Sequence, residues 1–189
     1  GLDLASVSDI ASLVLLLVKD GRIGVFIRNY LPEDAGKKDV KKNAVPYDVW
    51  AEQGWLTLTP GNVTDYNFIR KDINDLKDKY DLRSLGVDRW NSTQLVNDLV
   101  DDDINIAMFG QGMASMSGPM KQLERLILSG ELELLKDPVL EWMARNVVAK
   151  KDEADNIKPD RKNSKSKIDG MVALIMAIGR WMADGSDDQ

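Results

Sequence analysis

Three apolar runs open the chain and predict three consecutive β-strands. They are LDLASV over 2–7, IASLVLLLV over 10–18 and RIGVFIRNYL over 22–31. The dipeptide Asp20-Gly21 between the second and third runs is a strong hairpin signal, because both residue types accept the left-handed backbone of a tight turn. The unbroken LVLLLV segment indicates a strand covered on both faces, so we expect it near the centre of a layered sheet.

After these strands, helical and strand-like patterns alternate. Residues 65–81 show apolar positions at helical spacing, with Thr64 as the expected N-cap. Further helices are predicted at 45–50, 92–102, 116–130, 137–146 and 167–182, and short strands at 55–59, 83–88 and 104–111. Residues 147–166 are polar and basic and predict a hairpin or loop. This order predicts an α/β fold with a mixed sheet, whose first three strands are antiparallel, and helices on both faces.

Composition narrows the chemistry. The chain has 189 residues and a net charge of −6, and it contains neither cysteine nor histidine. Disulfides, thiolate zinc sites, cysteine nucleophiles and histidine bases are therefore excluded. Any catalysis would rest on carboxylates, Lys, Tyr, Ser or a metal. A metal held by this chain would be a hard cation bound by oxygen, which points to Mg²⁺ or Mn²⁺.

Carboxylates fall at the expected strand and helix ends, where ligand sites gather in α/β sheets. Asp3 lies within the first strand, Asp88 ends the 83–88 strand, and Asp169 begins the last apolar helix. Each also has a purely structural interpretation: Asp3 as a solvent-facing strand residue, Asp88 as a turn acid paired with Arg89, and Asp169 as an ordinary first-turn acid. Asp9 fits a tight turn but also lies within reach of such a site. Together, the three acids predict a two-metal site for phosphodiester hydrolysis.

Basic residues are unevenly distributed. One group, Lys37, Lys38, Lys41 and Lys42, occupies a single loop. A second group precedes Asp169 and consists of Lys150, Lys151, Lys158, Arg161, Lys162, Lys165 and Lys167. Interspersed acids also allow this segment to be a solvated loop. Its position nevertheless predicts contacts to DNA phosphates by Arg161, Lys162, Lys165 and Lys167, with Lys167 favoured for the scissile phosphate. Arg89, beside Asp88, is a further candidate for contact with DNA, with orientation of Asp88 or a purely structural role as the alternatives.

Four segments resemble the nuclease domain of tailed-bacteriophage terminase large subunits. They are GLDLASVSDIASLVLL, LGVDRWNSTQLVNDL, FGQGMASMSGPMKQLERLILSGELELLKDPVLEWMARN and KIDGMVALIMAIGR, and they span nearly the whole chain in the family's order. The resemblance implies an RNase H-like fold and metal-dependent cleavage of concatemeric double-stranded viral DNA. It places the metal-binding acids at Asp3, Asp88 and Asp169, with Asp9 as an accessory. Some relatives carry two adjacent acids at the last position, where this chain has Ile168-Asp169.

The resemblance also sets expectations for organisation and partners. We expect a single nuclease domain over 1–183 and a polar tail over 184–189. The chain has no Walker motif, so the family's ATPase motor would belong to a full-length protein. The expected partners are double-stranded DNA, that motor, the terminase small subunit and the portal, at the procapsid in the host cytoplasm, and the isolated domain would be a monomer. Two alternatives stay open: another RNase H-like phosphotransferase, such as a Holliday-junction resolvase or transposase, and a non-catalytic module that docks DNA or the portal.

Overall fold

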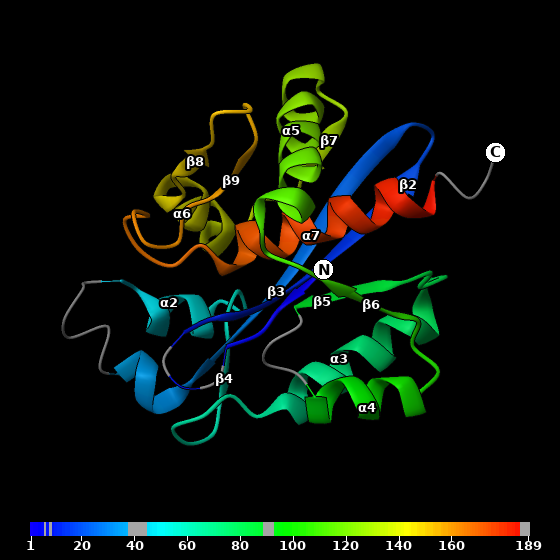
Figure 1. The fold of residues 1–189 in the computed structure, drawn as a ribbon. Helices are drawn as coiled ribbons and strands as arrows, with labels where there is room; N and C mark the ends of the chain where they lie inside the picture. The colour runs from blue at the N-terminus through cyan, green and yellow to red at the C-terminus, as the bar shows by residue number, and fades with distance from the viewer. Residues whose placement is uncertain (6, 8, 38–44, 89–92, 186–189) are drawn as a thin grey trace.

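A computed structural model describes residues 1–5, 7, 9–37, 45–88 and 93–185. The described part of the chain forms a seven-stranded sheet in the order β4-β3-β2-β1-β5-β6, with β7 paired to another part of β3 (Figure 1). The strands of this sheet are β1 Leu2–Asp3, β2 Ala11–Lys19, β3 Arg22–Pro32, β4 Thr57–Thr59, β5 Leu85–Asp88, β6 Ile106–Phe109 and β7 Leu132–Leu134. A separate hairpin pairs β8, Ala149–Lys151, with β9, Ile157–Pro159.

The sheet begins as the predicted antiparallel meander and then becomes parallel. β2 pairs antiparallel with both β1 and β3. Asp20 and Gly21 join β2 to β3 with φ angles of 50° and 76°, which is the backbone that a two-residue hairpin turn requires. β5 then lies parallel to β1, and β6 lies parallel to β5. The mixed sheet with an antiparallel start is confirmed, and the apolar strand β2 occupies an interior position.

Helices cover both faces of the sheet. They are α2 Tyr47–Glu52, α3 Tyr66–Lys79, α4 Thr93–Asp101, α5 Met113–Ser129, α6 Pro138–Asn146 and α7 Asp169–Asp184. Figure 1 shows α5, α6 and α7 on one side and α3 and α4 on the other. One apolar core joins α5 and α7 to β2 and β3, and a second joins α3 and α4 to β1, β2 and β5. α7 packs directly on β2, β1 and β5, so its first turn is held against the strand ends.

The structure corrects three details of the sequence interpretation. Asp65, not Thr64, caps α3, and its side chain accepts a hydrogen bond from the Asn67 amide. β7 was not predicted, because its three residues are too few to show an alternating pattern. The first strand was expected over 2–7 but covers only Leu2–Asp3. Ser92, the first residue of the helix predicted over 92–102, lies outside the described residues. Within the described residues, no helix is long and apolar enough to cross a membrane.

Candidate active site

Asp3 and Asp88 lie at the ends of neighbouring parallel strands. Leu2 of β1 is in register with Val87 of β5, so the next residue on each strand, Asp3 and Asp88, lies beside the other on one face. Asp3 is only 2% exposed. Burial raises the pKa of Asp3, and the negative charge of Asp88 adds to that rise, against the opposing effect of Arg161. The sheet topology therefore brings two of the predicted acids together.

Asp169 is the first residue of α7 and lies close to the same acids. Its side chain is buried, and its Oδ2 atom has no hydrogen-bond partner among the described residues. Burial raises the pKa of Asp169 to about 7, and the charges of Asp9 and Asp3 add to the effect. The apolar helix explains why an acid stands here: nine residues of α7 are buried, which fixes the first turn, and the carboxylate on it, against the sheet.

Arg161 bridges two of the acids. Its Nη1 atom donates to Oδ1 of Asp169 at 2.8 Å, and its Nη2 atom donates to Oδ2 of Asp3. Burial works against the charged guanidinium, but the two carboxylates outweigh that effect and raise the pKa of Arg161. The loop is shaped locally by Asp160, whose side chain accepts hydrogen bonds from the amides of Lys162 and Asn163. This turn presents Arg161 to the acids.

Gln111 is a member of the site that the sequence interpretation missed. Its Nε2 atom donates to Oδ1 of Asp3 at 2.8 Å, while its main-chain oxygen accepts from Nζ of Lys158 at 3.2 Å. Gln111 comes two residues after β6, the parallel neighbour of β5. The rule that singled out Asp88, polar side chains just beyond parallel strands, would also have identified Gln111.

The predicted phosphate contacts have different surroundings. Nζ of Lys167 lies 2.9 Å from Oδ1 of Asp9, and its side chain is 15% exposed. Lys162 and Lys165 are exposed. Arg161 and Lys162 line a cavity of about 320 Å³, together with Lys150 and Lys158 from the β8–β9 hairpin. Arg89 lies outside the described residues, and so do Lys38, Lys41 and Lys42 of the first basic group.

The donor chemistry of the site fits a hard divalent cation. Asp3 and Asp169 offer buried carboxylate oxygens, one of them unpartnered, and oxygen ligands are what Mg²⁺ and Mn²⁺ prefer. Among the residues described, however, no three acidic side chains lie close enough to hold a metal ion as they stand. The group that joins Asp3 to Asp169 is the guanidinium of Arg161 instead. A divalent ion that used the two oxygens held by Arg161 would have to displace the guanidinium.

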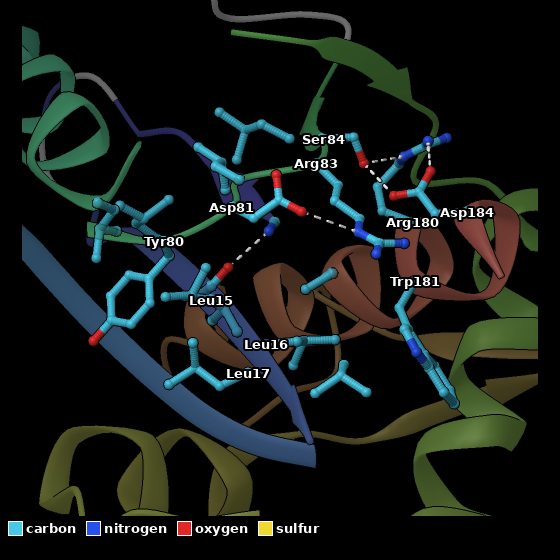
Figure 2. Close-up of a pocket in the computed structure, with 18 of the residues that line it drawn as sticks. Leu15, Leu16, Leu17, Tyr80, Asp81, Arg83, Ser84, Arg180, Trp181 and Asp184 are labelled. Atoms are coloured by element: carbon cyan, nitrogen blue, oxygen red, sulfur yellow. Dashed lines mark hydrogen bonds and ion pairs between the residues drawn. The ribbon is translucent and has the colours of Figure 1, made fainter. Parts of the chain in front are cut away.

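Figure 2 shows another cavity, of about 530 Å³. Leu15–Leu17 and Trp181 form much of its wall. At its edge, the Ser84 hydroxyl lies 2.6 Å from Oδ2 of Asp184 and 3.2 Å from Nε of Arg180. None of the predicted acids lines this cavity, so it is separate from the candidate active site.

Known proteins share both the fold and the sequence features of this chain. The fold is that of solved phage terminase nucleases: the nuclease of thermophilic phage G20c, solved with bound magnesium, aligns over 95% of this chain and 79% of its own with a TM-score of 0.62 at 14% identity. The family model described as "Terminase large subunit, endonuclease domain" matches residues 1–185. The chain belongs to this family.

More similar relatives agree with that assignment. The large terminase subunit of Enterobacteria phage HK97 is 37% identical over 184 residues, which cover 95% of this chain and 36% of that protein. Its crystal structure aligns with a TM-score of 0.87, covering 95% of this chain and 38% of that one. Protein YmfN of Escherichia coli K12 is 34% identical, covering 98% of this chain and 43% of that protein. The chain thus spans less than half the length of these curated relatives.

Proposed function

We propose that this domain is a divalent-metal-dependent endonuclease that cleaves concatemeric double-stranded viral DNA during genome packaging. The observation that carries the proposal is the convergence of buried Asp3 and Asp169 on one guanidinium, with Asp88 on the adjoining parallel strand. Membership of the terminase endonuclease family supports the same reaction class. The magnesium bound in the phage G20c nuclease supports the choice of cation.

In this proposal Asp3, Asp88 and Asp169 hold two divalent ions, with Asp9 in an accessory role. Two such ions, when bound, would activate the attacking water and stabilise the leaving oxygen of the phosphodiester. The protein's own contribution is rigid placement: Asp3 and Asp88 are fixed by strand register, and Asp169 by the packed helix α7. Gln111 orients Asp3 through its hydrogen bond to Oδ1.

Basic side chains around the 320 Å³ cavity would bind the DNA backbone. The cavity adjoins the acids through Arg161 and brings together Lys150, Lys158 and Lys162. Sequence-independent affinity for DNA comes mainly from neutralising phosphates in this way. The net charge of −6 does not oppose this, because the cations are concentrated beside the site.

The wider setting belongs to the same proposal, and family membership supports it. We place this nuclease beside an ATPase motor in a full-length large subunit, with the small subunit and the portal as partners, at the procapsid in the host cytoplasm. We also propose that 1–183 forms one nuclease domain, followed by a polar tail over 184–189, and that the isolated domain is a monomer.

Plasmid cleavage tests the proposal. Supercoiled plasmid would be incubated with the native domain, Asp169→Asn and Asp20→Asn, each with Mg²⁺, Mn²⁺ or EDTA. Asp20→Asn is the matched control, because it makes the same change in charge within an exposed hairpin turn that also suits Asn.

We expect nicking and linearisation by the native domain and by Asp20→Asn with a divalent ion and none with EDTA. Groups that merely support metal ligands typically contribute about 10- to 100-fold, so losing a ligand should lower the cleavage rate at least about 100-fold. Cleavage by a folded Asp169→Asn variant at the native rate would contradict the assignment of the site. Preferential cutting of four-way junctions, or strand transfer, would indicate a different RNase H-like phosphotransferase.

A further inference from the structure

Arg161 stands between two sets of charges of opposite sign. On one side it pairs with the side chains of Asp3 and Asp169, which are 3% and 4% exposed. On the other side it lines the basic cavity with Lys150, Lys158 and Lys162. Its own side chain is 42% exposed, so it has room to turn away from the acids.

On the acid side, Arg161 pairs with two of the side chains that would hold the metal ion of the proposed function. It engages one oxygen of Asp3 and one oxygen of Asp169 at the same time. Buried carboxylates need a cation or a hydrogen-bond donor, because ionised groups without compensation are costly inside a protein. The guanidinium and a divalent ion therefore compete for the same two side chains.

On the cavity side, Arg161 shares the lining with three lysines and one acid, Asp160. Lysines outnumber Asp160 in this lining, so without a phosphate in the cavity the guanidinium is better compensated by Asp3 and Asp169. A DNA phosphate in the cavity reverses this preference, because phosphate is a good bidentate partner for arginine. The same side chain thus has two anionic sites within its reach.

We propose that Arg161 exchanges one anionic partner for another. It pairs with Asp3 and Asp169 when no metal is bound, and it moves to a DNA phosphate in the basic cavity when a divalent ion takes its place. This inference rests on the metal site of the proposed function. It follows that metal and DNA strengthen each other's binding, and that the coupling is the same whichever binds first. A domain without DNA holds its metal weakly, so the active site becomes fully loaded with metal only when DNA binds.

Metal affinity measured without DNA tests the competition. Mn²⁺ would be titrated calorimetrically into the native domain, Arg161→Gln and Arg125→Gln. Arg125 is the matched control: it makes a two-pronged contact to Glu131 at 2.8 and 3.2 Å on the exposed surface, so its loss removes the same charge and the same type of pair. We expect Arg161→Gln to bind Mn²⁺ about 5-fold more tightly or better, in line with ordinary coupling between sites. Arg125→Gln should match the native domain.

The opposite result would identify a different role. If Arg161 holds the acids in place for the metal, Arg161→Gln will bind Mn²⁺ no more tightly than the native domain, and the inference is overturned. If Arg161→Gln fails to fold, Arg161→Lys would be used in its place. The lysine variant keeps the positive charge but loses the two-pronged contact. Its Mn²⁺ affinity should then exceed the native value, and an equal or lower affinity is the overturning result.

Duplex binding tests the transfer. The affinity for a fluorescent 20-base-pair duplex would be measured by anisotropy at constant ionic strength, on ice, with EDTA and with Mn²⁺. The gain in affinity from Mn²⁺ should be several-fold larger for the native domain than for Arg161→Gln, and equal gains would overturn the transfer. Tighter Mn²⁺ binding by Arg161→Gln than by the native domain, in a domain that cuts no plasmid, would support this inference while contradicting the nuclease proposal. Equal Mn²⁺ binding by native domain and Asp169→Asn would overturn both.

Discussion

Gly170, which follows Asp169 in the first turn of α7, has no space for a side chain. A Cβ atom at this position would lie 2.8 Å from Cδ1 of Ile27 and 2.8 Å from Sδ of Met143. Both distances are shorter than ordinary van der Waals contact, so the substitution Gly170→Ala must displace these side chains or the helix turn itself. Because Asp169 is the adjacent residue, a shift of the turn would also move the carboxylate.

The net effect on stability follows from two opposing contributions. Overpacking a well-packed core costs about 1–3 kcal/mol. Replacing glycine by alanine in a helix returns up to about 1 kcal/mol, and less in the first turn than in the middle. We therefore expect Gly170→Ala to lower the free energy of unfolding by about 1–2 kcal/mol. For a domain of this size, that corresponds to a fall in Tm of about 2–8 °C.

Gly24→Ala in β3 is the matched control. A Cβ there would lie 3.7 Å from its nearest neighbours, both in Leu17, which is ordinary contact, and its φ is not left-handed. Thermal and urea unfolding of both variants, in EDTA, would give the difference. Where the helix turn gives way, Asp169 moves with it, so plasmid cleavage by Gly170→Ala should also fall relative to Gly24→Ala. Equal stability of the two variants would refute the packing argument, and a destabilised Gly170→Ala with native cleavage would refute the link to Asp169.

Two further predictions concern charge and packing. Burial raises the pKa of Asp169 to about 7 in the folded domain, compared with 3.8 for an ordinary aspartate such as that of the unfolded chain. The contribution of Asp169 to stability therefore falls as the pH rises from about 4 to about 7. In EDTA, Asp169→Asn should therefore become progressively more stable relative to the native domain over this range, as urea unfolding at pH 4.5, 6 and 8 would show; a constant or declining difference would contradict the assigned burial. Ile175→Ala removes a side chain that is 1% exposed and should cost about 2–5 kcal/mol. Leu128→Ala, at a position 80% exposed, should stay within about 0.5 kcal/mol in the same denaturation experiment, and similar losses for both would contradict the core described for α7.

Local sequence patterns predicted most of the strands and helices. The hairpin at Asp20-Gly21 and the end of α5 at Gly130, whose φ is 71°, each depend on residues adjacent in sequence. The incorrect cap at Thr64 shows the limit of such patterns, since Asp65 is as good a cap and only the backbone decides between them. β7 was missed for a different reason: its three residues are stabilised by pairing with β3, more than a hundred positions away.

The sequence by itself determined the alternation of strands and helices, the absence of histidine and cysteine, and the acids that any oxygen-bound metal would have to use. Periodicity and turn chemistry act over a few residues, so they are legible without a structure. Only the tertiary structure decided that Asp3 lies beside Asp88. It also decided that Arg161, which is 158 positions after Asp3, pairs with both Asp3 and Asp169. It also paired Lys167 with Asp9. Those contacts depend on strand register and on the packing of α7 against the sheet, and no local spacing encodes which cation will meet which carboxylate.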